Sequence, residues 1–184
     1  LSLCNKNFQN MNSKDSSKAK HNLLLDVCLA AKYEGESIKT HYPKYDAEYP
    51  SGSGHTTCTA LARSFADIGD IIRGKDIFIG NKKKDKLEEN LKKIFENIKK
   101  SDAKLTNLND DQIREYWWAL NRQDVWKALT CDADGSYFRA TCSDSEHSGT
   151  FSQANKHCRC DKDKGAKDGD QVPTYFDYVP QFLR

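Results

Sequence analysis

Seven cysteines in a chain of 184 residues constrain the possible folds more than any other feature of this sequence. Four of them lie within residues 131–170, where Asp, Ser, Gly and Lys dominate. The only large apolar anchors of this stretch are Tyr137, Phe138 and Phe151, too few for so long a loop to pack by itself. We therefore expect disulfides to hold it, in an oxidising compartment. Every cysteine is a candidate for pairing: Cys4, Cys28, Cys58, Cys131, Cys142, Cys158 and Cys160.

Zinc is the alternative use of the same side chains. Suitable ligand types are supplied by Cys142, His147, His157, Cys158 and Cys160. Two cysteines separated by one residue are not, however, the usual zinc-binding pair, in which two residues intervene. We favour disulfides and expect neither a metal nor a cofactor. The connectivity stays open, because six paired cysteines allow many arrangements, and the odd number points to a free thiol or to a partner outside the chain.

Hydrophobic spacing predicts a mostly α-helical fold, and strand signals are weak throughout. We expect four helices, over residues 23–34, 57–72, 87–98 and 110–129. The first would follow the capping residue Asn22 and end at Gly35, with a loop over residues 40–57. The second has the clearest core-facing stripe and would stop at Gly74. Residues 82–86 form a charged break before the third helix, which we expect at the surface.

The fourth predicted helix carries apolar side chains on two faces. One stripe contains Trp117 and the other contains Trp118, and the two stripes are rotated by roughly 140°. We expect burial on both sides, because indole rings need large contact areas. The cluster of Tyr116, Trp117 and Trp118 is therefore assigned to the core and not to a sugar-binding platform.

Charge is distributed unevenly along the chain. The net charge of +2 indicates neither nucleic acid nor a membrane surface as a partner. Residues 73–100 nevertheless hold ten Lys and Arg against five acids. Such a face can hold a sulfated polysaccharide through additive point charges, although charge runs are commonly just solvated. The candidate contacts, of which the first three are the best, are Lys82, Lys83, Lys84, Lys86, Lys92, Lys93, Lys99 and Lys100.

No catalytic motif is visible. The five histidines lie in polar or loop segments, and neither a nucleophile elbow nor a His-Glu-x-x-His motif occurs. The Ser- and Gly-rich residues 51–54 lack the Gly-Lys-Ser/Thr continuation of a phosphate-binding loop. We expect a binding module and not an enzyme. No apolar run approaches the length of a transmembrane helix, and we expect both ends of the chain to be cuts within a larger protein.

Four blocks of the sequence resemble one known family. They are residues 22–36, 62–76, 114–131 and 173–184. The second block closely resembles the signature of Duffy-binding-like alpha domains, and in this chain it reads Ala62-Arg63-Ser64-Phe65-Ala66-Asp67-Ile68-Gly69-Asp70-Ile71-Ile72-Arg73-Gly74-Lys75-Asp76. These domains are the N-terminal adhesion domains of malaria-parasite variant erythrocyte membrane proteins. The other blocks agree with the same family, in order, over nearly the whole chain.

The resemblance implies a Duffy-binding-like helical fold of three subdomains with long disulfide-braced loops. Residues 1–56 would end the first subdomain, and residues 57–184 would form much of the second, truncated at its C-terminus. The third subdomain would be absent. The four cysteines between Asp67 and Val179 depart from the two-cysteine version that is more often associated with rosetting, and residues 132–171 correspond to the most variable part of such domains.

The function implied by the resemblance is adhesion outside the infected erythrocyte. The chain would bind host red-cell receptors or glycans, such as heparan sulfate-like chains, blood-group sugars or complement receptor, in rosetting or cytoadherence. It would also be a variant antigen, with host antibodies and adjacent domains of the same protein as further partners. The alternative is a non-binding structural head domain that antibodies recognise, while a neighbouring domain carries the adhesion.

Overall fold

A computed structural model describes residues 19–48, 56–77, 82–133, 135, 137, 140–143, 151–154, 157–160 and 171–184. Its helices are α1 (Ala19–Glu48), α2 (Thr57–Arg73), α3 (Lys82–Ser101) and α4 (Asp110–Leu129). Two short strands and three 3-10 turns complete the described residues, namely β1 (Ala140–Ser143), β2 (Phe151–Gln153), η2 (Ala103–Leu105), η4 (Phe176–Tyr178) and η5 (Gln181–Leu183). The predicted mostly helical fold is confirmed. Within the described ranges, no helix combines the length and the apolar character needed to cross a membrane.

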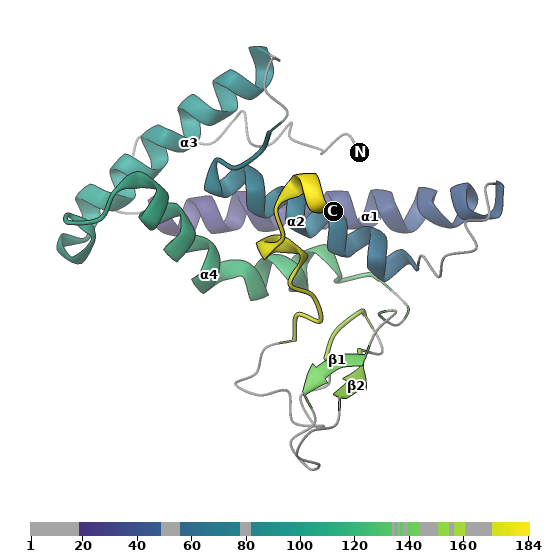
Figure 1. Cartoon of the computed structure of the whole chain (residues 1–184). Coiled ribbons are helices and arrows are strands. Elements are labelled where there is room, and N and C mark those ends of the chain that lie inside the picture. The colour runs from purple at the N-terminus through teal and green to yellow at the C-terminus, as the bar shows by residue number, and fades with distance from the viewer. Residues whose placement is uncertain are drawn as a thin grey trace.

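The helices form one bundle from which two parts project. Helices α1, α2 and α4 pack on one another, and α3 packs on α1 and α4. Figure 1 shows α3 rising from one end of α4, whereas the strands lie on the opposite side of the bundle. The C-terminal segment returns across α2, so that η4 lies against this helix.

Helix α2 forms the centre of the core, as its sequence predicts. The hydroxyl of Thr56 caps its start by accepting a hydrogen bond from the Thr59 amide at 3.3 Å. Gly74 ends it in the left-handed conformation, with φ of 70°, which a residue without Cβ adopts at little cost. The whole predicted stripe is buried, namely Cys58, Leu61, Ala62, Phe65, Ile68 and Ile72.

Helix α4 is buried on two sides, which confirms the prediction. Trp117 meets Phe95 of α3 with ring centroids 6.2 Å apart, and Trp118 meets Phe65 of α2 at 5.1 Å. The assignment of Tyr116 to the core is wrong, because its side chain is 57% exposed. At about 100° per residue, the two buried stripes merge into one wide arc, and Tyr116 falls on the narrow arc that remains for solvent.

Helix α1 is longer than its sequence predicts. It runs from Ala19 through Gly35 to Glu48, so the start after Asn22, the stop at Gly35 and the loop from residue 40 are wrong. A Cβ added to Gly35 would lie 1.9 Å from the carbonyl oxygen of Leu129. The glycine therefore marks the closest approach of α1 to the end of α4, and not a helix terminus.

Two disulfides brace the region after α4, and one of them attaches it to the bundle. Cys58 on α2 is bonded to Cys158, and Cys142 on β1 is bonded to Cys160. Residues 140 and 153 pair at the open end of the small antiparallel sheet, and Ser143 pairs with Phe151 at the other end. The predicted bracing of this region by disulfides is confirmed, and the two disulfides consume three of the sulfurs on which the zinc alternative depends.

Candidate receptor-contact surfaces

The lysine-rich segment is one continuous helix with no break at its start. Helix α3 begins at Lys82, so the expected charged break over residues 82–86 is wrong, and these residues form its first turn. The side chains of Lys82, Lys83 and Lys84 lie outside the described residues. Exposed lysines follow along the helix at positions 86, 92, 93 and 100.

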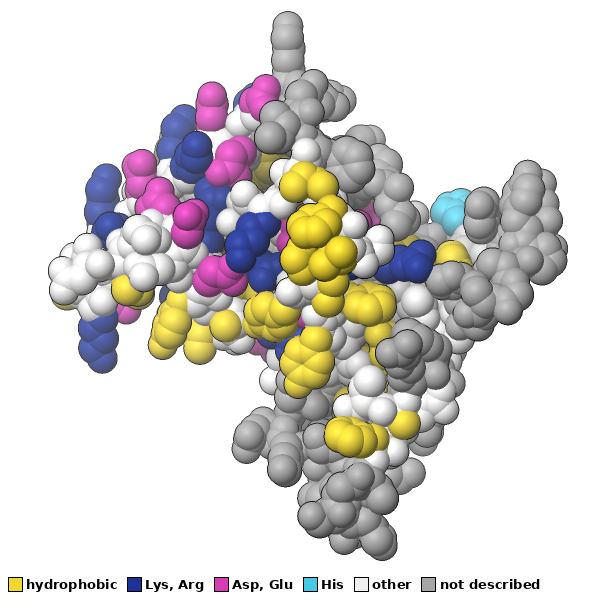
Figure 2. Space-filling model, in the orientation of Figure 1, with side chains coloured by type: hydrophobic (Ala, Val, Ile, Leu, Met, Phe, Trp, Pro, Cys, Tyr) yellow, Lys and Arg dark blue, Asp and Glu magenta, His cyan; other side chains and the backbone are white. Residues whose placement is uncertain are grey.

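Acidic side chains interrupt this basic face. Glu89 and Glu96 are exposed on the same helix, and they precede Lys93 and Lys100 by four residues each. This spacing brings side chains onto one face of a helix, with the acid on the favourable N-terminal side. Figure 2 accordingly shows basic and acidic side chains alternating over the part of the surface that α3 occupies.

Two charged residues of α3 have structural roles instead. The ammonium group of Lys99 donates to the carbonyl oxygen of Leu108 at 2.6 Å and so fixes the connection to α4. The carboxylate of Glu88 accepts two hydrogen bonds from the guanidinium of Arg114, at 2.9 and 3.2 Å. Arg114 is buried on α4, and its guanidinium lies 5.2 Å from the ring centroid of Phe95. Lys99 is therefore the least available of the candidate lysines whose side chains are described.

A buried charge cluster joins α2, α4 and the C-terminal segment. Its members are Asp70, Arg73, Arg122, Asp177 and Arg184. The guanidinium of Arg122 donates to both carboxylate oxygens of Asp177, at 2.8 and 3.0 Å. Arg73 donates to the carboxylate of Asp70 at 3.1 Å and also to the backbone oxygen of Asp177, and Arg184 forms an ion pair with Asp70.

This buried charge cluster was not predicted from the sequence. It connects residues 62–76 with residues 173–184, which lie far apart in the chain. One feature of the sequence could have indicated it. Asp177 lies among Tyr175, Phe176 and Tyr178 in an otherwise apolar stretch, and a carboxylate buried with such a stretch usually has a charged or hydrogen-bonding partner. Nothing in the sequence, however, identifies Arg122 as that partner. Both blocks consequently stabilise the fold through buried charged side chains, namely those of Asp70, Arg73, Asp177 and Arg184.

Large apolar side chains gather outside the buried charge cluster. We call Tyr116, Leu120, Tyr175, Tyr178 and Phe182 the exposed aromatic surface, because each is at least partly open to solvent. Figure 2 shows hydrophobic side chains collected where the C-terminal segment crosses the bundle. An open hollow of about 750 Å³ adjoins Tyr116, and a smaller one of about 190 Å³ adjoins Tyr178 and Phe182.

The floor between the two hollows is charged but internally paired. Arg73 and Lys75 line both hollows. The carboxylate of Glu115 forms an ion pair with Lys75 and lies 3.5 Å from Arg73. Because each charge has a partner of opposite sign, this floor is not a strong anion site, and the exposed aromatic surface beside it is mainly apolar.

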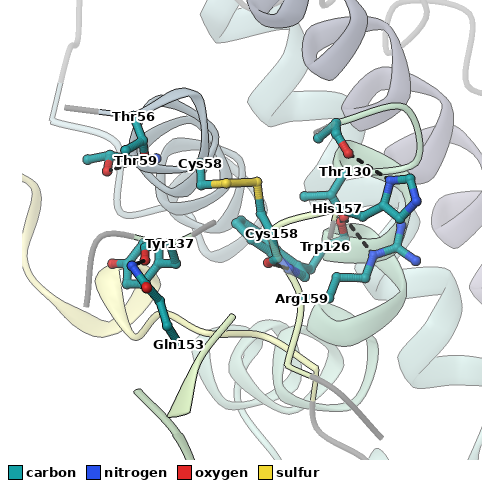
Figure 3. The surroundings of a disulfide bond; sticks show 11 residues. Thr56, Cys58, Thr59, Trp126, Thr130, Tyr137, Gln153, His157, Cys158 and Arg159 are labelled. Atoms are coloured by element: carbon teal, nitrogen blue, oxygen red, sulfur yellow. Dashed lines mark hydrogen bonds between the residues drawn. A yellow bond between two sulfur atoms is a disulfide. The ribbon is translucent and has the colours of Figure 1, made fainter. Parts of the chain in front are cut away.

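The residues around Cys158 attach the loops to the end of α4 (Figure 3). The indole of Trp126 donates to the carbonyl oxygen of Cys158 at 3.1 Å. The guanidinium of Arg159 donates to the hydroxyl of Thr130 at 2.9 Å and to the carbonyl oxygen of Lys127 at 2.7 Å. A cation at this position suits the C-terminal end of a helix. The disulfides and these hydrogen bonds together fix residues 158–160 to both α2 and α4.

Two further cysteines carry thiols. Among the described residues, Cys28 and Cys131 form no disulfide, and Cys4 lies outside the described residues. Burial, followed by the charge of Asp124, raises the pKa of the Cys28 thiol to about 11. The pKa of the exposed Cys131 thiol is also raised, by partial desolvation and by a hydrogen bond with Asp132. Both thiols are therefore protonated near neutral pH.

Comparison with known proteins gives a consistent result. The family model of the Duffy binding domain matches residues 1–184. The chain is 37% identical, with a TM-score of 0.74, to the NTS-DBL1(alpha-1) domain of the Plasmodium falciparum membrane protein 1 (PfEMP1) from the varO strain. It is 29% identical, with a TM-score of 0.60, to the DBLbeta domain of PfEMP1 IT4var13, whose structure is bound to ICAM-1.

These similarities cover nearly all of this chain but less than half of each relative. The matched part is 98% of this chain in both comparisons, and it spans 39% of the varO domain chain and 40% of the IT4var13 domain chain. No curated protein matches the chain.

Proposed function

Since the chain belongs to the Duffy binding domain family, we propose that it is part of an extracellular adhesion module that displays a host-binding surface on the infected erythrocyte. The observation that carries this proposal is the match of the family model over residues 1–184. Support comes from the similar DBLbeta domain, whose structure is bound to the host protein ICAM-1. The same surface would be a variant antigen for host antibodies.

Helix α3 is the part of this chain that we assign to glycan binding. It projects from the bundle, and its outer face carries exposed lysines and no large apolar side chain. Sulfated glycans of the host red-cell surface would be drawn to these lysines by point-charge attraction, which falls as salt rises. The contacts would come from Lys82, Lys83, Lys84, Lys86, Lys92, Lys93 and Lys100, with a smaller contribution from Lys99.

The test is binding to immobilised heparin by the chain and by the triple variant K82E/K83E/K84E. Three cations in the first turn of a helix oppose its macrodipole, and acids there favour it, each by about 0.3–1 kcal/mol. We therefore expect the variant to fold at least as stably as the wild-type chain and yet to bind heparin more weakly. Unchanged heparin binding would contradict the assignment to α3.

A second candidate function rests on a different observation. Four charged side chains of residues 62–76 and 173–184, those of Asp70, Arg73, Asp177 and Arg184, are paired inside the fold, which suits a structural head domain that binds little itself. In that case antibodies would recognise its surface, while a neighbouring domain would bind the host cell. A folded domain of full family length that does not bind uninfected erythrocytes, with or without soluble heparin, would support this second function.

A further inference from the structure

We propose that residues 158–160 form a clamp that isolates the helical bundle from residues 144–150 and 161–170, so that both of these segments can change in length and sequence without disturbing the fold. The two segments lie outside the described residues, whereas the clamp and the residues at the segment ends are described. The clamp would act in this way whether or not the chain binds a glycan.

The clamp links three different elements through three consecutive residues. Cys158 is bonded to Cys58 of α2, and Cys160 is bonded to Cys142 of β1. Between them, the guanidinium of Arg159 donates to two oxygen atoms at the end of α4, at 2.9 and 2.7 Å (Figure 3). Helix α2, helix α4 and strand β1 are therefore joined at one place in the chain.

The backbone beside the clamp is held in a conformation that it would not adopt by itself. His157 and Cys158 have φ of 56° and 53°, in the left-handed region where a Cβ crowds the backbone. Such residues persist only where surrounding contacts over-determine them. The carbonyl oxygen of Cys158 accepts from the indole of Trp126 at 3.1 Å, and its amide donates to the carbonyl oxygen of Gly135 at 3.4 Å. The imidazole Nδ1 of His157 lies 2.7 Å from the carbonyl oxygen of Ala133.

Each of the two segments begins and ends at residues that are already joined. Ser143 pairs with Phe151 across the ends of the first segment. The amide of Cys160 donates to the carbonyl oxygen of Gln171 at 3.0 Å across the ends of the second. The entropy of closing a loop grows only with the logarithm of its length. A longer segment between such fixed ends should therefore cost the fold little.

The apolar side chains of this region belong to the residues around the two segments. Within the segments, no apolar side chain is larger than that of Ala166. The buried apolar residues that surround them are Ala133, Tyr137, Cys142, Ala154, Cys158, Cys160 and Val172. Because hydrophobic stabilisation follows the apolar area removed from water, the segments themselves have little to contribute to the core.

The experiment changes the segments and the clamp separately in the full chain. Each segment is replaced by a Gly/Ser linker of the same length and by one of twice that length. Arg159→Ala weakens the clamp while both disulfides stay in place. Lys127→Ala is the matched control, because the clamp uses the carbonyl oxygen of Lys127 and not its ammonium group. Amide hydrogen exchange is followed in α2, α4 and the two strands, and non-reducing mass spectrometry verifies the disulfides.

We expect all four linker variants to change the exchange rates in α2 and α4 by less than about threefold, since doubling the length of a closed loop changes its closing equilibrium by about that factor. Arg159→Ala should accelerate exchange in the strands and at the amide of Cys158 by at least about tenfold, because two charge-assisted hydrogen bonds are lost. Lys127→Ala should change the same rates by less than about twofold, because its side chain forms only an exposed ion pair.

A linker variant that accelerates exchange in α2 or α4 by about tenfold or more would show that the segments support the bundle, and it would overturn the proposed isolation. Equal effects of Arg159→Ala and Lys127→Ala would overturn the role of Arg159 in the clamp. No host ligand enters these measurements, so neither result can be confused with a failure of the proposed adhesion function.

Discussion

The carboxylate of Asp177 lies wholly inside the protein, where both of its oxygens accept hydrogen bonds from the guanidinium of Arg122. The indole of Trp118 donates to the same carboxylate at 3.0 Å. Arg122 and Trp118 belong to α4, whereas Asp177 belongs to η4, so this group of three fastens the C-terminal segment to the bundle. The packing of the segment over α2 depends on it.

Replacing Asp177 by Ala should destabilise the protein by about 3–5 kcal/mol, because it leaves the buried charge of Arg122 without its carboxylate. The measurement is urea unfolding followed by tryptophan fluorescence. Asp124→Ala is the matched control, since Asp124 pairs with Lys127 at 3.4 Å in an exposed ion pair. Its loss should cost less than about 1 kcal/mol. Similar midpoints for the two variants would contradict the structural role of Asp177.

Replacing Gly35 by Ala should destabilise the packing of α1 on α4. The new Cβ would collide with the backbone of Leu129, at a cost of about 3 kcal/mol, while the better helix propensity of Ala returns about 1 kcal/mol. We expect a net loss of about 2 kcal/mol in thermal or urea unfolding. The neighbouring exchange Glu36→Ala serves as control and should have little effect. A stabilised Gly35→Ala chain would show that the two helices are not in contact there.

The two disulfides should contribute unequally to stability. Cys58 and Cys158 are 100 residues apart in the chain, whereas Cys142 and Cys160 are 18 apart. In the chain-entropy account, closing the longer loop contributes about 4.7 kcal/mol and closing the shorter one about 3 kcal/mol. We therefore expect C58A/C158A to unfold at lower urea than C142A/C160A. The reverse order would mean that the hairpin contributes more to folding than its position outside the bundle indicates.

The two described thiols should differ in reactivity. In a Cys4→Ser background, iodoacetamide at pH 8 should modify the exposed Cys131 well before Cys28, and mass spectrometry of peptides can follow both. The Cys28 pKa of about 11 lies above the ordinary value of 9.0, so its thiolate fraction, and with it the alkylation rate, should rise about tenfold per unit between pH 8 and 10.

The raised pKa of Cys28 should also make the free energy of unfolding depend on pH in the alkaline range. Because the folded pKa of Cys28 is raised, the unfolded chain ionises first, and stability should begin to fall as the pH rises through 9 and continue to fall toward 11. The variant Cys28→Ala should lack this part of the pH dependence. Equal alkaline destabilisation of the wild type and the variant would refute the assignment.

The elements that could be predicted from sequence are those governed by local rules. The stop at Gly74 and the buried stripe of α2 each depend on residues a few positions apart. The errors arose where distant contacts decide the outcome. Gly35 does not end α1, because the helix needs a residue without Cβ where it crosses α4. Tyr116 is exposed because two buried faces leave one arc of α4 free.

The candidate site could likewise be predicted only where its features depend on residues close together in the sequence. That lysines cluster on one helix could be predicted, because charge and hydrophobic spacing are visible in the sequence. The hydrogen bond from Lys99 to the Leu108 carbonyl depends on how the chain turns after α3. The spacing of apolar residues does not reveal that turn. The pairing of Arg122 with Asp177 spans 55 positions, and nothing in the sequence distinguishes Arg122 from the six other arginines as the partner.

The buried charge cluster, which uses side chains of residues 62–76 and 173–184, bears on how such chains are compared. Buried side chains that stabilise a fold are retained in related proteins regardless of which host molecule binds at the surface. Similarity in these two blocks therefore indicates common ancestry. It says little about which host molecule or tissue the protein binds. Two parasites could carry the same blocks and still adhere to different tissues, so host preference has to be sought by aligning only the side chains that point outward.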